Sequence, residues 1–96
     1  MKVEYSNRAI DDLRKISTDS RREFGDSVAA ALETRIKTTV DRISRFPEAA
    51  ATVKNRPGAY VLPLVRYPFK IFYRVLEDRV RIQHIRNTSR RTPEGD

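Results

Sequence analysis

The chain contains no cysteine, no tryptophan and only one histidine, His84. Without cysteine it can form neither a disulfide bond nor a thiolate metal site. A single histidine cannot by itself make a histidine-rich metal site or a cluster of histidine and carboxylate ligands, so a zinc enzyme is not expected. We therefore predict a protein with no metal and no other cofactor.

The sequence also lacks a long hydrophobic run. No apolar stretch approaches the roughly 18 residues needed to cross a bilayer, and polar residues follow Met1–Tyr5 at once, where a signal peptide would have its apolar core. We therefore expect a soluble, cytoplasmic protein. Its 96 residues suffice for one domain with one core. We assign residues 1–91 to this domain and residues 92–96 to a short C-terminal tail.

Positive charge is concentrated in the second half of the chain. Residues 1–53 carry ten lysines and arginines against nine acidic residues, a net charge of +1. Residues 54–96 carry ten against four, a net charge of +6. A surface that binds a polyanion or an acidic partner is therefore expected in the second half.

The first half is predicted to form a helical hairpin. Ser6 is a natural N-cap, Gly25 a plausible end of the first helix, and Phe46–Pro47 the end of the second. The acidic residues Asp11–Asp12 are expected in the first turn of the first helix, where the helix dipole favours negative charge. Asp26–Ser27 should supply the cap of the second helix. Apolar residues recur at helical spacing in both segments, at Ile10, Leu13, Ile16 and Phe24, then at Val28, Leu32, Ile36, Val40 and Ile43.

Alternation with a period of two predicts β-strands elsewhere. Lys2–Tyr5 is a short strand, and Tyr60–Leu64 is another in which Pro63 suits a sheet edge or a bulge. The segments Phe69–Leu76 and Arg79–Arg86 are rich in β-branched and aromatic residues and should form a hairpin.

The order of these elements predicts the fold class. The apolar phase of the last strand slips between Ile82 and Ile85, which indicates a bulge near Gln83–His84 or burial on both faces. Residues 49–58 should be a loop. The order β-α-α-β-β-β then gives an α+β domain, a helical hairpin packed on a small, twisted antiparallel sheet.

Four segments carry a resemblance to a known family: Ala9–Leu13, Phe46–Glu48, Tyr67–Arg74 and Ile82–Arg90. In order and spacing they resemble the toxins of the ParE/RelE superfamily, which belong to bacterial type II toxin–antitoxin modules. The resemblance spans residues 3–93, nearly the whole chain. It implies the fold predicted above and a cognate acidic antitoxin, ParD-like or RelB-like, as a partner.

The superfamily places two activities on one fold, so the fold cannot choose between them. ParE-like toxins bind DNA gyrase and trap its cleaved-DNA state without chemistry of their own, whereas RelE-like toxins cleave mRNA on the ribosome. The strand Tyr67–Arg74 and the segment Arg86–Pro93 resemble the ParE-like branch, which we favour. The alternatives are a RelE-like endonuclease and a non-toxic, basic nucleic-acid-binding domain. The last is disfavoured because the chain lacks the signatures of common RNA-binding modules.

Catalytic residues are expected only if the chain is RelE-like. The resemblance would then assign catalysis to Lys70, Arg90 and His84. Two strand lysines of a well-known RelE-like toxin fall at Val61 and Pro63, and no tyrosine or histidine follows Arg90. A proton-transfer set is therefore incomplete. We predict no ribosome-dependent cleavage of mRNA, and expect His84 to be a partly buried residue of the sheet.

Cations of the last two strands and of the C-terminal end are the candidate target-binding residues: Lys70, Arg74, Arg81, Arg86, Arg90 and Arg91. Those on the strands could equally be the solvated face of a half-exposed sheet. Arg90 and Arg91 follow the last apolar residue, where the stability of the fold requires little of them. For the antitoxin, we expect an exposed apolar groove along the helical hairpin, lined by Ile10, Leu13, Ala29, Leu32 and Ile36.

Overall fold

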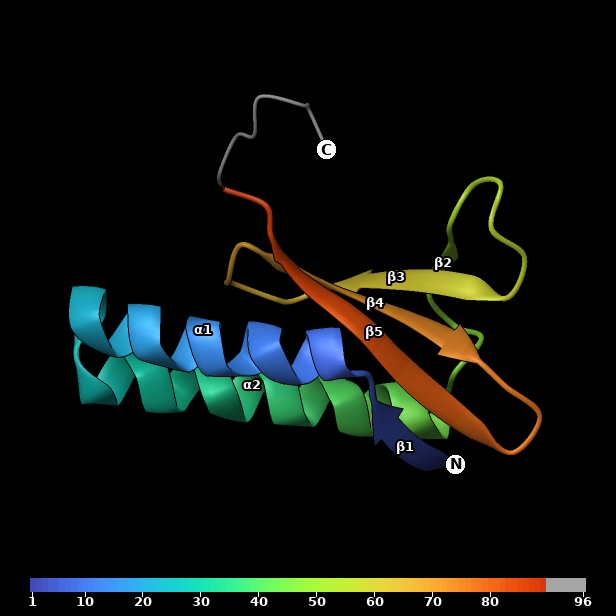
Figure 1. The fold of residues 1–96 in the computed structure, drawn as a ribbon, viewed down its shortest axis with the longest axis horizontal. Helices are drawn as coiled ribbons and strands as arrows, with labels where there is room; N and C mark the ends of the chain where they lie inside the picture. Colours follow the sequence, from blue (N-terminus) through green and yellow to red (C-terminus); the bar gives the residue numbers. More distant parts are fainter. Residues whose placement is uncertain (90–96) are drawn as a thin grey trace.

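A helical hairpin packs against one face of a five-stranded sheet (Figure 1). The computed structural model describes residues 1–89. Its elements are β1 (Lys2–Tyr5), α1 (Asn7–Phe24), α2 (Asp26–Arg45), β2 (Ala51–Thr52), β3 (Ala59–Pro63), β4 (Phe69–Val75) and β5 (Arg79–Asn87). The strands lie in the order β1-β5-β4-β3-β2. Neither helix of the described chain is both long and apolar enough to cross a membrane.

The predicted α+β fold is confirmed, with two differences in the sheet. β1 runs parallel to β5, with Tyr5 opposite Ile82, so the sheet is mixed and not wholly antiparallel. β2, which falls in the segment predicted to be loop, pairs with Tyr60 and Val61 at the opposite edge. β2 was missed because a two-residue strand is too short to show a period in the sequence. The direction of β1 was missed because the direction of a short edge strand depends on where the helical hairpin returns the chain. The boundary between domain and tail lies outside the described residues and stays a prediction.

The ends of the helices follow from local chemistry. The Ser6 side chain accepts a hydrogen bond from the Ala9 amide at 3.0 Å and caps α1 as predicted. Gly25 ends α1 with a φ of 89°, a conformation that favours glycine, and α2 begins at the next residue. Asp26 therefore lies within the first turn of α2, and no side chain caps this helix. The expectation that Asp26 or Ser27 caps α2 was wrong, because Gly25 leaves no room for a separate capping residue.

The core lies between α2 and the inner face of the sheet. Its most deeply buried members are Leu32, Ile36, Val40 and Ile43 of α2 with Ile71, Tyr73, Val80, Ile82 and Ile85 of the sheet. Tyr73 has no exposed surface, stacks on Tyr60 at 5.5 Å and donates a 2.7 Å hydrogen bond to the Pro47 carbonyl. Burial raises the pKa of the Tyr73 hydroxyl to about 12. This residue attaches the C-terminal end of α2 to the sheet.

The predicted bulge in β5 is confirmed. Phe72 pairs with His84 and Tyr73 with Ile82, so Gln83 is the extra residue. The Ser6 hydroxyl donates to the Gln83 carbonyl at 2.8 Å, and the Ser6 amide donates to the Ile82 carbonyl at 2.9 Å. β1 ends at this level, and α1 follows it along the edge of β5. The bulge therefore marks the place where a helix replaces a strand as the neighbour of β5.

Candidate functional site

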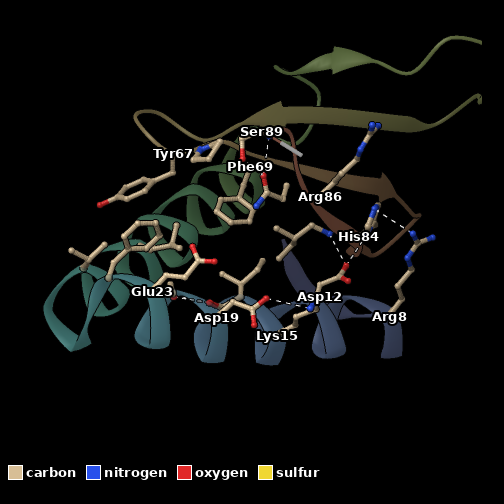
Figure 2. Close-up of a pocket in the computed structure, with 18 residues that line it drawn as sticks. Arg8, Asp12, Lys15, Asp19, Glu23, Tyr67, Phe69, His84, Arg86 and Ser89 are labelled. Carbon is tan, nitrogen blue, oxygen red and sulfur yellow. Dashed lines mark hydrogen bonds and ion pairs between the residues drawn. The ribbon is translucent and has the colours of Figure 1, made fainter. Parts of the chain in front are cut away.

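A cleft of about 550 Å³ lies between α1 and the C-terminal half of β5 (Figure 2). Arg8, Asp12, Lys15, Asp19 and Glu23 recur at intervals of three or four residues on α1, so they form one rim of the cleft. The opposite rim is polar and its floor is largely apolar. The opposite rim includes Arg86, Asn87 and Ser89, and the floor includes Ile16, Phe24, Val28, Leu32, Tyr67, Phe69 and Ile85. An apolar trough between charged rims can accommodate an amphipathic polypeptide segment.

The end of the cleft near the tip of the helical hairpin exposes apolar side chains. Phe24 is 63% exposed and Val28 is 42% exposed. Both lie next to the turn at Gly25, where the two helices no longer cover each other. Clustered apolar exposure of this kind is typical of a surface that another polypeptide covers.

Asp12 and Arg8 hold His84 at the mouth of the cleft. Asp12 Oδ2 accepts a 2.9 Å hydrogen bond from the Ile85 amide and lies 2.7 Å from His84 Nδ1. Arg8 Nη2 lies 3.3 Å from His84 Nε2. A neutral imidazole that donates from Nδ1 to Asp12 and accepts at Nε2 from Arg8 satisfies both contacts. The network fixes the orientation of the ring and gives the edge of β5 a partner beyond the end of β1.

This network was missed in the sequence. α1 begins at Asn7 and has no acidic residue in its first turn, so the expectation that Asp12 interacts with the helix dipole there was wrong. Asp12 reaches instead across to β5, 72 residues away in the chain. The spacing of four between Arg8 and Asp12 places both on one side of the helix, but nothing in the sequence indicates which strand they face. His84 is partly buried, as predicted.

The outer face of the sheet, on the side away from the helices, carries cations around an aromatic pair. Phe69, Ile71 and Tyr73 point to the core, so the alternate residues of β4 point outward. Three cross-strand pairs join β4 to β5 on this face: Lys70 with Arg86, Phe72 with His84, and Arg74 with Arg81. The rings of Phe72 and His84 are within 21° of parallel, with centroids 5.8 Å apart. The structure thus brings together four of the six predicted target-binding residues.

The four cations differ in what holds them. Arg74 donates a 2.8 Å hydrogen bond to the Pro57 carbonyl. Arg81 forms an ion pair with Glu4 of β1, and this hydrogen bond lowers the pKa of the Glu4 carboxyl below its usual range. Within residues 1–89, no ion pair involves Lys70 or Arg86. The other two predicted target-binding residues, Arg90 and Arg91, lie outside the described residues.

Most residues of the predicted antitoxin groove are buried in the structure, although Leu13 and Ile36 line a separate hollow between the two helices. Ala29, Leu32 and Ile36 are at most 4% exposed, because the apolar stripe of α2 packs against the sheet. Leu13 is partly buried, and only Ile10 of the predicted five is substantially exposed. Of these five residues, only Leu32 lines the cleft beside β5. A role for any of them in binding an antitoxin stays a prediction.

The residues named for RelE-like catalysis are only partly assembled. Lys70 lies on the outer face beside Pro63 of β3, and the next pair on the same face joins Val61 to Phe72. Both ring nitrogens of His84 already have protein partners, and Arg90 lies outside the described residues. In the described part of the chain, no group of three histidine or carboxylate side chains is close enough to hold a metal ion.

Comparisons with known proteins agree with this geometry. Residues 3–92 match the family model described as ParE toxin of type II toxin-antitoxin system, parDE. Comparison of the sequence with curated proteins gave no significant match.

Solved structures share the fold. A chain of the chromosomal ParDE system from P. aeruginosa superposes with a TM-score of 0.78 at 24% identity, covering 91% of this chain and 95% of that one. The isolated E. coli RelE toxin superposes with a TM-score of 0.65 at 17% identity, covering 97% of this chain and 88% of that one. The intact E. coli RelBE complex gives 0.64 at 17% identity, covering 93% and 98%. At such identities the likeness establishes the fold alone.

Proposed function

Because this chain belongs to the ParE toxin family of type II toxin–antitoxin systems, we propose that it inhibits growth by binding DNA gyrase. It traps the enzyme's cleaved-DNA state and is held inactive by a cognate acidic antitoxin. The observation that carries the proposal is the extent of the ParE match, residues 3–92, which includes all of the fold except the first residue of β1. The proposal also places the protein in the cytoplasm, where gyrase acts.

The outer face of the sheet supports binding over chemistry. A nuclease of this fold needs a base and an acid that can reach the substrate protons. Lys70 has an apolar neighbour on β3, Pro63, and His84 is held by Asp12 and Arg8. Cations fixed on a rigid sheet recognise acidic side chains or phosphates at little ordering cost.

The cleft beside β5 supports the proposed neutralisation. Antitoxins of this type fold a disordered segment onto the toxin, which requires an apolar surface to bury. Phe24 and Val28 supply that surface. The rim on α1 carries both cations and carboxylates, and Arg86 lies on the opposite rim. The antitoxin would thus lie along the outside of α1, against the edge of the sheet.

The test uses purified chain, purified gyrase and supercoiled plasmid. We expect inhibition of supercoiling and an accumulation of cleaved DNA after denaturation, both reversed by the antitoxin encoded beside the chain. Lys37→Ala, which removes an exposed cation from α2, serves as a control and should keep full activity.

A parallel reaction with programmed ribosomes should show no cleavage of mRNA above background. Codon-specific cuts that Lys70→Ala abolishes, together with unaffected gyrase, would replace the proposal with RelE-like activity. Loss of neutralisation on Phe24→Ser, with toxicity retained, would locate the antitoxin in the cleft.

A further inference from the structure

His84, the single histidine of the sequence, lies at the mouth of the cleft beside β5. Its two ring nitrogens face α1, where Asp12 Oδ2 lies 2.7 Å from Nδ1 and Arg8 Nη2 lies 3.3 Å from Nε2 (Figure 2). Histidine is the side chain that ordinarily changes its charge near neutral pH. A change of charge at this position therefore acts directly on two residues that line the cleft.

The two contacts require different roles of the two ring nitrogens. Asp12 Oδ2 also accepts a 2.9 Å hydrogen bond from the Ile85 amide, so this carboxylate oxygen is an acceptor and Nδ1 carries the proton. Arginine has donors only, so Nε2 is the unprotonated nitrogen that accepts from Arg8. Only the neutral ring can satisfy both partners.

Protonation of His84 would break one of these contacts and strengthen the other. A proton on Nε2 makes this atom a donor, so two donors and two positive charges then face each other across 3.3 Å. The contact with Asp12 becomes an ion pair. Arg8 is exposed and can turn into solvent, whereas Asp12 is partly buried and is also bound to the Ile85 amide. The arginine is therefore the partner that leaves.

Other charged groups near His84 lie farther from the ring. The ring stacks on Phe72 of β4, which carries no charge. The remaining charged residues on α1 and on the neighbouring strands are Lys15, Lys70, Arg74, Arg86, Arg81 and its partner Glu4. The cations among them oppose protonation of the ring, but the cross-strand pairs on either side of it are about 7 Å away along the strands. The direct contacts with Asp12 and Arg8 therefore dominate the response to pH.

We propose that His84 is a proton-controlled latch on Arg8, and that protonation of the ring strengthens the binding of an acidic polypeptide in the cleft. The neutral ring holds the guanidinium, and the protonated ring releases it to the rim of the cleft. Arg8, Asp12 and His84 together then carry one more positive charge than with the neutral ring. The choice of occupant rests on the proposed function, which places the acidic antitoxin in this cleft. The release of Arg8 is a property of the chain alone.

The first experiment follows the two imidazole nitrogens of the full, isotope-labelled chain by NMR between about pH 8 and pH 5. A single histidine gives a single set of signals, which needs no further assignment. We expect the Nδ1–H tautomer at the upper end of this range and a doubly protonated ring at the lower end. An Nε2–H tautomer at the upper end would contradict the contact with Arg8 and overturn the proposal.

Three substitutions test which groups control this titration. Arg8→Ala removes the opposing cation and should move the midpoint for His84 to higher pH, whereas Asp12→Asn removes the favourable charge and should move it to lower pH. Arg14→Ala is the matched control, because this arginine of α1 is also exposed but lines the hollow between the helices. It should leave the midpoint close to that of the parent chain. An unchanged midpoint in folded Arg8→Ala would overturn the proposal.

The second experiment measures the affinity of the purified antitoxin encoded beside the chain at about pH 7.5 and about pH 6. We expect roughly twofold to fivefold tighter binding at the lower pH, which is the range for one exposed ion pair. His84→Gln cannot be protonated and Arg8→Ala has no guanidinium to release, so both should lose this gain, whereas Arg14→Ala should retain it.

A gain of equal size in His84→Gln would mean that the antitoxin's own groups titrate, and would overturn the proposal. Thermal melts at both pH values establish that each variant is folded. Inhibition of gyrase and its reversal by the antitoxin, measured at one pH, test the proposed function separately. The latch can therefore fail while the proposed function stands, and the NMR titration can succeed if the proposed target is wrong.

Discussion

The Lys70–Arg86 and Arg74–Arg81 pairs lie on the same two strands and face the same side of the sheet, yet the fold treats them differently. Arg74 and Arg81 have structural partners in the Pro57 carbonyl and the Glu4 carboxylate. Lys70 and Arg86 have no such ion-pair partner within the described chain. The comparison shows that the number of cations on a strand does not reveal how many are available to a ligand.

The largest expected effect separates the two pairs by function. Lys70→Ala/Arg86→Ala should sharply reduce growth inhibition while changing the free energy of unfolding by no more than about 0.5 kcal/mol, as is typical of surface positions. Arg74→Ala should keep most of the toxicity, because its guanidinium is already bound to Pro57. Growth arrest on induction, measured beside thermal melts, checks both. A toxic Lys70→Ala/Arg86→Ala variant with an unchanged melt would remove the distinction between the pairs.

The next largest effect is expected for Asp12, which contacts β5 from α1 as Glu4 contacts it from β1. Asp12→Ala leaves the Ile85 amide at the edge of β5 without its acceptor, which should cost about 1–3 kcal/mol of stability. Asp12→Asn retains an acceptor oxygen and should cost less. The midpoint of denaturant unfolding gives both values. Equal stability of the two variants would show that solvent replaces this contact.

Tyr73→Phe should have a smaller effect at neutral pH. Losing the hydrogen bond to the Pro47 carbonyl should lower stability by about 0.5–1.5 kcal/mol. The pKa of Tyr73 is raised in the folded state, so its contribution is complete below pH 10 and is lost as pH rises towards about 12. The melting temperatures of the two proteins should therefore converge in this range. A difference in melting temperature that stays constant up to pH 12 would contradict the raised pKa of Tyr73.

The smallest effect concerns the ion pair that holds Arg81. The pKa of Glu4 is lowered in the folded state, so its contribution is present above the ordinary glutamate pKa and is lost as pH falls through the lower, folded value. Glu4→Gln should flatten this acid limb of the stability curve slightly. It should also release Arg81 and modestly strengthen polyanion binding, an effect that salt screens. Weaker polyanion binding by Glu4→Gln would indicate that Glu4 positions Arg81 for the ligand.

Much of the fold is predictable because it follows from local periodicity. The helical spacing of the apolar residues fixes both helices, and the cap at Ser6 and the turn at Gly25 follow from single residues. The bulge is also local, since only an extra residue keeps both Ile82 and Ile85 in the core. These features depend on residues a few positions apart, so a single sequence contains them.

The candidate site is less predictable, because it joins distant segments. The sequence indicates that the second half is basic and that Lys70 and Arg86 are candidates, and the structure places them side by side. The sequence does not indicate that α2 buries Leu32 and Ile36, residues expected to bind the antitoxin. An apolar stripe looks the same whether it faces a sheet or a partner.

By itself, the sequence determined both helices, every strand except β2, the bulge, the absence of cysteine chemistry and the concentration of positive charge in the second half. Only the tertiary structure decided that β1 pairs in parallel with β5, that α1 borders the cleft, and that Asp12 holds His84. Only the tertiary structure assigned Glu4 to Arg81, 77 residues later in the chain. Contacts between residues this far apart depend on how the elements pack, and the spacing of side chains within either segment does not predict them.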